Sequence, residues 1–595
     1  MWRGILGKPI SVQRLDREGK QLVLHSDGYI CRSTSGLLGG ETFSLVVANF
    51  ITYLREHNSP LLDRLRIDFT SEENLSRLTK LLQMLALHSF DEVVEILPNT
   101  EAYVGKEQEL HEFVEALYDY WRSFERYLVC HSEHGSASHD TRPYRVFTDT
   151  VENLTHLVRS AYRDICENLT GDHPRVYRQV PAGCQVGLIA VQKPWPIPGK
   201  PYHILENIPF IRQIWIDPPL IIDPPMNKRT GQFRKVDKNP LDDVDLEPAK
   251  WLCFPAQVGP LVIFVYFHQY FIGLGSALAN LFELATDEQI AAGPDAVYAF
   301  GVPFEALSQF GELPTVFYDD QDSNLLVAAV PKADEFGYFG YIKKMVLTLH
   351  NIVMMKRGRM PFHGAMTKIM LRDGSQANVL IIGDTAAGKS ETLEALRILG
   401  EEYIKELRIV ADDMGSLAIE DGRLKAYGTE IGAFIRLDDL QQGYAFGQID
   451  RAIIMSPQKV NARVVLPVTT LREVLLGYPV DFLLYANNYE EVDELHPILE
   501  KFENVETALN VFREGAAMAK GTTTSTGLVH SYFANIFGPP QYKELHEKLA
   551  QETFNAAFEA GVYVGQLRTR LGIPGYETKG CEEGARALLQ CICSQ

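Results

Sequence analysis

The sequence predicts an α/β (α+β) protein, in which a C-terminal domain of alternating strands and helices follows a large mixed α/β region. Two observations predict this class. The apolar run 378–382 has the length of a buried strand, and residues 391–399 carry leucines at helical spacing before Gly400. Strand and helix patterns alternate in this way from about residue 325 to the end of the chain.

The length of 595 residues indicates more than one domain, and we expect a boundary between 1–330 and 331–595. Within the first region, residues 191–249 are rich in proline and charge, which predicts a flexible, irregular excursion or a lid. Apolar residues recur at helical spacing in three earlier segments, which we expect to be helices at 43–56, 71–88 and 107–127.

Charge and cysteine content restrict the classes of function. The formal net charge is −20 and no run of lysine or arginine stands out, so we expect no nucleic-acid partner. The eight cysteines are scattered without paired spacing, which argues against a disulfide framework. The most apolar stretch, 258–284, is interrupted by polar residues, and the first residues lack a signal-peptide pattern. We therefore expect a buried strand and helix at 258–284, no membrane partner and a cytoplasmic location.

The segment between the expected strand and helix matches a phosphate-binding loop. Residues 383–390 read Gly-Asp-Thr-Ala-Ala-Gly-Lys-Ser and fit the pattern G-x-x-x-x-G-K-[ST]. Gly383 and Gly388 would let backbone N–H groups face a polyphosphate, and the helix would direct its positive end toward it. Lys389 would neutralise the β- and γ-phosphates, and Ser390 would bind Mg²⁺. The residues expected to bind ATP, or another nucleoside triphosphate, are Gly383, Asp384, Thr385, Ala386, Ala387, Gly388, Lys389, Ser390 and Glu391.

Two adjacent carboxylates follow the next expected strand. Residues 409–411 are apolar, and Asp412 and Asp413 come directly after them. A carboxylate at a strand end beside a phosphate loop is a usual second anchor for the metal. Neighbouring residues of an extended strand point to opposite sides. One carboxylate would therefore hold the metal, while the other acts on its water shell or as a base toward the acceptor.

Residues upstream of the loop extend this constellation. The order Tyr338, Gly340, Lys343, Lys344 and His363, followed by the loop and the two aspartates, resembles the active site of ATP-dependent phosphoenolpyruvate carboxykinase. The resemblance covers roughly the last 260 residues of the chain. It implies the nucleotide-binding fold of that family for the C-terminal domain.

The carboxykinase resemblance implies roles for individual side chains. Lys344, His363 and Asp413 would bind a catalytic Mn²⁺, Tyr338 would lie near the organic acid, and Arg436 stands where that family has a lysine for the γ-phosphate. As a ligand, Lys344 must be neutral, because an ammonium group has no lone pair. The implied reaction is phosphoryl transfer between ATP and a small organic acid, with or without decarboxylation. The candidate catalytic residues are Tyr338, Lys343, Lys389, Asp412, Asp413 and Arg436, and the candidate metal ligands are Lys344, His363, Ser390 and Asp413.

The chain departs from this family where arginines would hold the carboxylate and phosphate groups of the acid. Leu475 stands where an arginine is expected, three residues before Tyr478. Arg32 is the one candidate for an N-terminal substrate arginine. These departures leave the identity of the acid open.

The loop is also similar to that of HPr kinase/phosphorylase. Residues 362–364, the loop together with Glu391, and residues 410–413 carry this second likeness. It implies transfer of phosphate to the hydroxyl group of a protein serine, with an aspartate as acid or base. A third hypothesis is a nucleotide-binding regulatory protein without turnover. The intact loop lysine and serine favour an enzyme, and the lysine–histidine pair upstream favours a small acid as the acceptor.

Overall fold

The computed structural model describes residues 11–15, 21–26, 31–67, 71–132, 143–231, 233–437, 446–520 and 526–594. About 40% of the residues are helical and 28% lie in strands of several mixed sheets, which confirms the mixed α/β class. The chain forms two compact units, the first of Met1–Gln192 with Pro209–Pro218 and the second of Lys193–Ile208 with Pro219–Gln595. The boundary expected at residue 330 therefore does not coincide with the division between these units.

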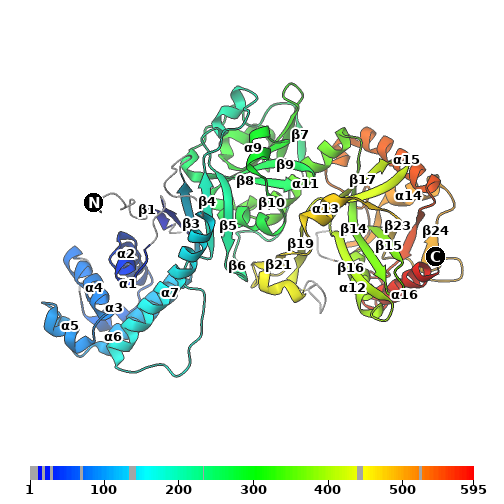
Figure 1. The fold of residues 1–595 in the computed structure, drawn as a ribbon. Helices are drawn as coiled ribbons and strands as arrows, with labels where there is room; N and C mark the ends of the chain where they lie inside the picture. The colour runs from blue at the N-terminus through cyan, green and yellow to red at the C-terminus, as the bar shows by residue number, and fades with distance from the viewer. Residues whose placement is uncertain are drawn as a thin grey trace. The chain divides into compact units, whose positions relative to one another are not determined.

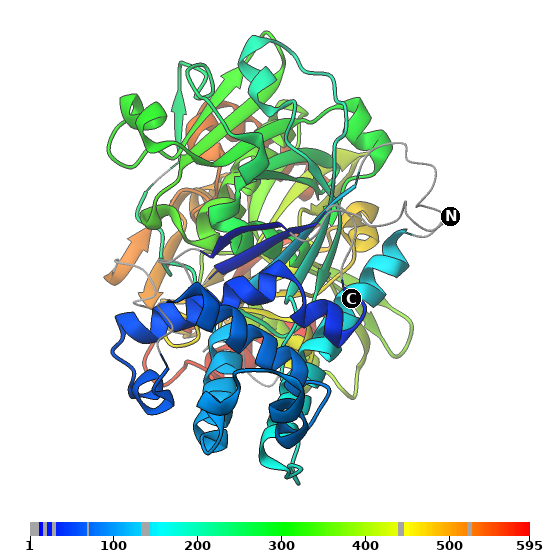
Figure 2. The same cartoon turned by 90° about the vertical axis from the view of Figure 1, so that its left-hand side faces the viewer.

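The first unit combines a mixed sheet with a cluster of helices, drawn in blue in Figure 2. The sheet pairs β1 antiparallel with β2, β2 and β4 parallel with β3, and β5 antiparallel with β4. The strands are β1 (Ser11–Leu15), β2 (Gln21–Ser26), β3 (Glu125–Ser132), β4 (Val186–Val191) and β5 (Phe210–Ile216). The helices are α1 (Thr34–Leu38), α2 (Glu41–Glu56), α3 (Pro60–Leu65), α4 (Glu72–Leu85), α5 (Phe90–Ile96), α6 (Glu107–Arg122) and α7 (Pro143–Thr170). They share one apolar core, as their helical spacing predicts.

One of the expected helices is shorter than the sequence predicts. The helix expected at 107–127 ends at Arg122, and Glu125 begins β3. Pairing of β3 with strands on both sides outweighs the helical spacing of these residues. Arg126 is only 1% exposed, and its guanidinium donates to the carbonyls of Phe124 (2.6 Å) and Gly183 (2.7 Å). These carbonyls thus compensate the buried charge of Arg126 at the point where the helix would have continued.

The second unit contains a largely buried sheet formed by residues before 332. Its strands β9, β11 and β13 are parallel and buried along their whole length, in agreement with their continuous apolar sequences. The strands, in spatial order, are β8 (Trp251–Val258), β9 (Leu261–His268), β11 (Ala296–Val302), β13 (Leu325–Pro331), β12 (Val316–Asp320) and β7 (Arg234–Val236). The buried strand and helix expected at 258–284 are confirmed as β9 and α8 (Ile272–Ala277). No helix in the described part of the chain is long and apolar enough to cross a bilayer.

The other large sheet of this unit carries the loop. Its central strand β14 (Met360–Leu371) pairs with β17 through its first residues, and with β15 and β16 through the rest. The other strands are β15 (Gln376–Ile382), β16 (Ile404–Ala411), β17 (Met414–Glu420), β18 (Arg423–Gly428), β22 (Tyr478–Pro479), β23 (Phe482–Asn487), β24 (Leu499–Lys501) and β27 (Tyr563–Arg568). Helices α12 (Lys389–Leu399) and α16 (Lys579–Cys593) pack together in one core with this sheet, as Figure 1 shows. The strand and the helix expected around the loop are therefore confirmed.

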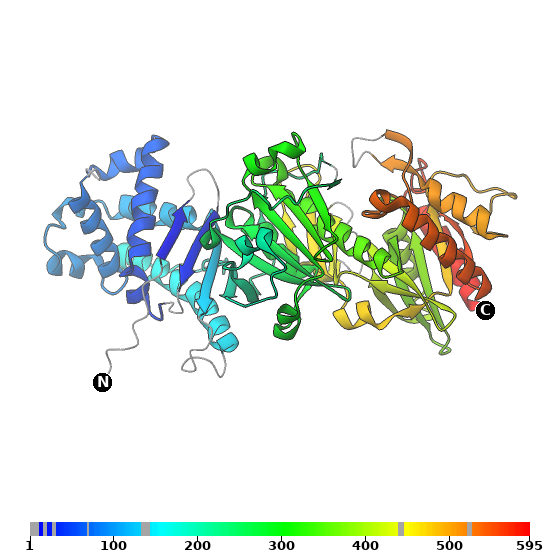
Figure 3. The ribbon, with the colours of Figure 1, turned by 90° about the horizontal axis from the view of Figure 1, so that it is seen from above.

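Helix α11 (Phe339–Lys356) connects the two large sheets. It contacts β9, β11 and β13 of one sheet and β14 and β17 of the other, and it lies between them in Figure 3. Nearly every residue of the helix is buried, and Lys343 is among them. A small sheet next to its N-terminal end consists of β6 (Leu220–Ile222), β19 (Gly432–Arg436), β20 (Ile453–Met455) and β21 (Arg463–Pro467). The remaining helices of eight or more residues are α14 (Val505–Glu514) and α15 (Lys543–Glu559).

Candidate functional site

The loop at 383–390 joins β15 to α12 and is tied to the neighbouring strand. Gly383 donates its backbone N–H to the carbonyl of His363 on β14, at 3.1 Å. Gly388, the residue before α12, has a φ of +91°, and a Cβ added there would lie 2.7 Å from the Cβ of Thr569. Both the left-handed backbone and this close approach require glycine. The second glycine of the motif is therefore needed for the conformation of the loop itself.

Two polar side chains from later in the chain support the middle of the loop. Thr569 Oγ1 donates to the carbonyl of Ala387 at 2.7 Å, and Asn488 Nδ2 donates to the carbonyl of Ala386 at 3.0 Å. Ala386 is left-handed, with a φ of +64°, which costs about 1–2 kcal/mol for a residue with a Cβ. Asn488 and Thr569 directly follow β23 and β27, which run parallel to β15. One edge of the sheet thus supplies both the loop and its supports.

Lys389 folds back onto the loop. Its side chain is nearly buried, and Nζ donates to the carbonyls of Gly383 (2.8 Å) and Asp384 (2.9 Å). These acceptors are neutral, whereas phosphate oxygens are charged and bind an ammonium about twice as strongly. Ser390 and Glu391 lie in the first turn of α12 and are half-buried. The loop residues expected from the sequence therefore lie together at the positive end of this helix.

The strands bring His363 and Asp413 together. His363 on β14 pairs with Met414 on β17, and the N–H of Gly364 donates to the carbonyl of Asp413 at 2.9 Å. His363 Nε2 lies 3.0 Å from Asp413 Oδ1. The other nitrogen, Nδ1, donates to the carbonyl of Ala534. Because a carbonyl only accepts, Nδ1 carries a proton; the contact of Nε2 with the Asp413 carboxylate requires a second proton on Nε2, whereas a metal ion would bind the lone pair of this nitrogen.

The residue that forms an ion pair with Asp413 is Lys343. Its Nζ lies 2.6 Å from Asp413 Oδ2 and 3.2 Å from Glu430 Oε1, and it is 1% exposed. Burial opposes the charge of Lys343, but the two carboxylates outweigh it and raise its pKa above the ordinary value. Burial likewise opposes the charge of Asp413, yet Lys343 and His363 hold its pKa well below the ordinary value. Lys343, expected as a catalytic residue, thus forms part of a preformed network of charges, in which Asp413 is half-buried and Lys343 is buried.

Glu430 is a member of this network that sequence reasoning missed. Glu430 lies in the connection from β18 to β19, and its side chain is fully buried. Burial raises the pKa of Glu430 to about 8, although Lys343 acts in the opposite direction. Asp412, which is 9% exposed, also raises that pKa through its charge. No motif marks Glu430, because its partners come from other segments of the chain.

Lys344 faces a different neighbour from Lys343. Its Nζ lies 4.7 Å from the centre of the Phe537 ring, which is 6.4 Å from the ring of His363. Removal from water, followed by the nearby charge of Arg229, lowers the pKa of Lys344 to about 8. This lysine therefore loses its proton more easily than an ordinary one, as a metal ligand must. The expected metal ligands Lys344, His363 and Asp413 all lie around the beginning of α11.

Two arginines that the sequence did not single out lie at the same end of α11. Arg229 stacks on Phe537 at 5.5 Å, and Arg463 stacks on Phe434 at 5.4 Å. Burial raises the pKa of Tyr338, and the charges of Arg463, Lys343 and Arg229 oppose that change, so both arginines lie near the tyrosine. Arg463 on β21 is also the register partner of Arg436 on β19. Positive charge is therefore concentrated around Tyr338.

These cations have few anionic partners. Within the described ranges, Arg229, Lys344 and Arg463 form no ion pair with a carboxylate. Arg229 comes from the segment 191–249, which hydrogen bonds hold against α11, because the N–H groups of Thr230 and Gly231 both donate to Tyr341 Oη at 3.1 Å. Arg32, the N-terminal candidate, is exposed and belongs to the first unit. The resemblance points to other positions for substrate arginines, whereas the fold brings Arg229 and Arg463 to this place.

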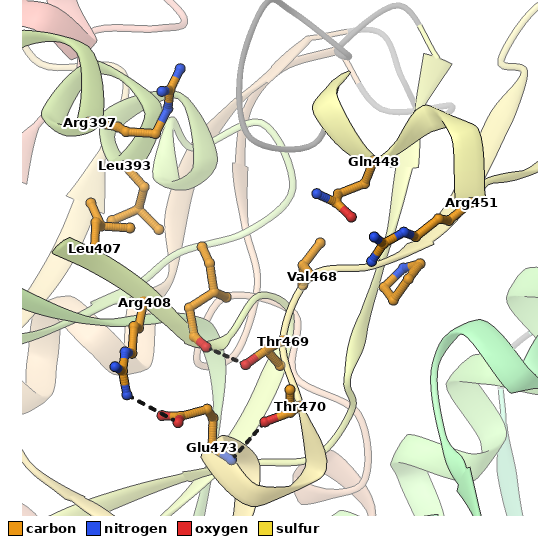
Figure 4. Close-up of a pocket in the computed structure, with 12 residues that line it drawn as sticks. Leu393, Arg397, Leu407, Arg408, Gln448, Arg451, Val468, Thr469, Thr470 and Glu473 are labelled. Atoms are coloured by element: carbon orange, nitrogen blue, oxygen red, sulfur yellow. Dashed lines mark hydrogen bonds and ion pairs between the residues drawn. The ribbon is translucent and has the colours of Figure 1, made fainter.

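A separate cavity of about 460 Å³ lies beside α12, as Figure 4 shows. None of the candidate site residues lines it. Arg408 is paired there with Glu473 at 3.3 Å, and Thr469 Oγ1 donates to the carbonyl of Ile409. The cavity is lined by Leu393, Arg397, Leu407, Arg408, Ile409, Gln448, Arg451, Pro467, Val468, Thr469, Thr470 and Glu473. It is thus distinct from the cluster around Tyr338 and His363.

Comparison of this chain with models of known protein families finds no match, and comparison with curated proteins finds none either. The geometry of the second unit and the residues of the loop therefore carry the functional argument.

Proposed function

We propose that this protein catalyses ATP-dependent phosphoryl transfer to or from a small organic acid, in the manner of a phosphoenolpyruvate carboxykinase. The observation that carries the proposal is the pair of Arg229 and Arg463. These cations lack carboxylate partners in the described part of the chain and lie near Tyr338, beside the pair of His363 and Asp413. A concentration of positive charge of this kind favours an acceptor that brings its own negative charges.

The loop is the expected place of the phosphate donor. Phosphoryl transfer requires positioning and cations on the developing charge rather than covalent chemistry by the protein. Lys389 would exchange its two backbone carbonyls for the β- and γ-phosphates. Ser390 would hold Mg²⁺, and Arg436 would contribute charge near the γ-phosphate. ATP is preferred as donor on the resemblance alone, and another nucleoside triphosphate fits the same loop.

The residues around His363 fit a Mn²⁺ ion. His363 Nε2 and Asp413 Oδ1 lie 3.0 Å apart, and two ligands of one ion are typically about 3 Å apart when each bond is about 2.1 Å long. Lys344, with its lowered pKa, supplies a second nitrogen, and such a mixed set of nitrogen and oxygen ligands suits a transition ion. When bound, this ion would act as a Lewis acid toward the organic acid. Lys343 would hold Asp413 in place, and Asp412 would act as the base.

A protein serine as acceptor is the alternative. A serine hydroxyl is neutral and would leave the charges of Arg229 and Arg463 uncompensated, so these two arginines favour the small acid. A regulatory protein without turnover is the third hypothesis, and it assigns no role to the Lys343–Asp413–His363 network. The cytoplasmic location and the absence of nucleic-acid and membrane partners stay predictions.

The test is a screen for ATP consumption with Mg²⁺ and Mn²⁺ across oxo-acids, hydroxy-acids and candidate proteins with an acceptor serine. We expect one class of small acid to stimulate consumption, and carbon dioxide release would reveal decarboxylation. The matched control is Lys389→Ala, which should show no stimulated consumption. Stimulation by a protein acceptor alone would replace the proposal with the kinase alternative. Tight ATP binding without consumption in any mixture would favour the regulatory hypothesis.

A further inference from the structure

A second cluster of metal-ligating side chains lies in the first unit, on the faces of α6 and α7 that pack together. His111 and Glu115 lie one turn apart on α6, and Cys166 lies on α7. His111 Nε2 is 3.6 Å from Glu115 Oε1, and Cys166 Sγ is 3.8 Å from the same oxygen. All three ligand atoms lie within 4.8 Å of one another. Residues 55 positions apart in the chain thus present one nitrogen, one oxygen and one sulfur to a common point.

These spacings fit a tetrahedral zinc ion. With Zn–N and Zn–O bonds of about 2.0 Å and a Zn–S bond of about 2.3 Å, neighbouring ligand atoms of a tetrahedron are about 3.3–3.6 Å apart. The distances of 3.6 and 3.8 Å from Glu115 Oε1 to His111 Nε2 and Cys166 Sγ are close to this range. A thiol, an imidazole and a carboxylate are the donor types that zinc prefers, whereas Mg²⁺ and Ca²⁺ take oxygen ligands alone.

The carboxylate of the cluster is also held in place. Tyr162, one turn before Cys166 on α7, donates its hydroxyl to Glu115 Oε1 at 2.6 Å. The ring of Tyr162 is stacked on that of Tyr118 with centroids 4.0 Å apart, which fixes the hydroxyl. An outer hydrogen bond of this kind orients a metal ligand before the ion arrives.

Access to the cluster is one-sided. Cys166 is buried, whereas the side chains of His111 and Glu115 are 26% and 44% exposed. An ion would enter from solvent and keep one coordination position for water. We propose that His111, Glu115 and Cys166 bind a zinc ion that links α6 to α7. On binding, the thiol of Cys166 releases its proton to solvent as the sulfur–metal bond forms.

The test is titration of the full-length protein, reduced and freed of metal, with Co²⁺ as a spectroscopic substitute for Zn²⁺. We expect one equivalent of Co²⁺ to produce a thiolate-to-cobalt charge-transfer absorption, and Zn²⁺ to displace it. The candidate Mn²⁺ ligands include no cysteine, so binding at His363 gives no such signal. Absence of the absorption in the wild-type protein would overturn the proposal.

Variants identify the cysteine that binds the cobalt ion. Cys166→Ser should abolish the absorption, whereas Cys593→Ser, at an exposed position, should retain it. Tyr162→Phe leaves all three ligands in place and should weaken Co²⁺ binding about 10- to 100-fold. Glu112→Gln alters a carboxylate of α6 that pairs with Arg64 instead, and it should bind Co²⁺ like the wild type. An unchanged absorption in Cys166→Ser would contradict the assignment.

Discussion

The loop at 383–390 and the charge network at the beginning of α11 satisfy their cations in different ways. Lys389 is held by two neutral backbone carbonyls of its own loop. Lys343 is held by two carboxylates, at 2.6 and 3.2 Å, in the interior of the unit. The first arrangement leaves a cation that a phosphate attracts away from its present partners. The second is a set of ion pairs that already compensate one another.

The loop and the charge network therefore depend on the fold in different ways. Removing a carbonyl-bound lysine leaves only neutral acceptors, so the loop should keep its shape without Lys389. Removing one member of a buried ion pair leaves an uncompensated charge, which costs more than the pair contributes. Substitutions in the loop should therefore act on function, and substitutions in the network should act on function and stability together.

Lys389→Ala is expected to have the largest effect on activity. Without its charge on the β- and γ-phosphates, kcat/KM for ATP-dependent transfer should fall about 100- to 1,000-fold. The midpoint of thermal unfolding should change little, because the partners of Lys389 in the described part of the chain are backbone carbonyls. Steady-state kinetics and calorimetry measure both quantities, with Lys405→Ala on the exposed face of β16 as a control. Unchanged turnover in Lys389→Ala would remove the loop from the proposed mechanism.

Asp413→Asn should change stability as well as function. It leaves the ammonium of Lys343 with Glu430 alone and removes a proposed Mn²⁺ ligand. We expect the free energy of unfolding to fall by about 3 kcal/mol and Mn²⁺ binding to be lost. Denaturant titration and Mn²⁺ binding followed by paramagnetic resonance measure these changes. The matched variant is Asp412→Asn, which should retain Mn²⁺ binding, and equal loss in both variants would contradict the division of roles between the carboxylates.

The loop could be predicted from the sequence because its chemistry is local. The strand, the glycines, Lys389 and the helix all lie within 25 consecutive residues, and each follows from short-range patterns. Asp413 and His363 could be predicted as neighbours only through the resemblance. The physical cause of their approach is the register of β14 with β17, which composition and periodicity do not reveal.

The rest of the site could not be predicted because it is assembled from distant segments. Glu430 acquires its role by burial next to Lys343, and Asn488 and Thr569 reach the loop because β23 lies next to β15 and β27 lies next to β23. Arg229 comes from a segment that looked irregular from its proline and charge content. Helical spacing likewise failed after Arg122, where strand pairing decides the structure. In each case tertiary packing outweighs the local pattern.

Arg229→Gln and Arg463→Gln should weaken binding of the acceptor acid and leave binding of the donor ATP unchanged. A charge-assisted hydrogen bond contributes about 1.5–3 kcal/mol, so each variant should raise KM for the acid about 10- to 100-fold. The affinity for ATP should stay unchanged, because neither arginine contacts the loop in the described part of the chain. Arg234→Gln, at an exposed position of β7, serves as the control. A rise in KM for ATP instead would place these arginines at the donor.

The burial of α11 itself also appears in the pH dependence of stability. His350 on this helix is fully buried, its Nδ1 lies 3.0 Å from Asn351 Oδ1, and burial lowers its pKa to about 4. The unfolded chain takes up a proton near the ordinary histidine pKa of about 6.5, but the folded chain does so only near 4. The contribution of His350 to stability is therefore complete above pH 6.5 and is lost as the pH falls toward 4, by up to about 3 kcal/mol.

Denaturant titrations between pH 7 and 4.5 test this. The free energy of unfolding should decline less steeply in His350→Gln than in the wild type. His530→Gln, at an exposed position, should decline like the wild type. The decline in His350→Gln should not vanish, because burial also lowers the pKa of His546 to about 4. Equal slopes in His350→Gln and the wild type would show that α11 opens to water before the unit unfolds, which would contradict a network preformed in the interior.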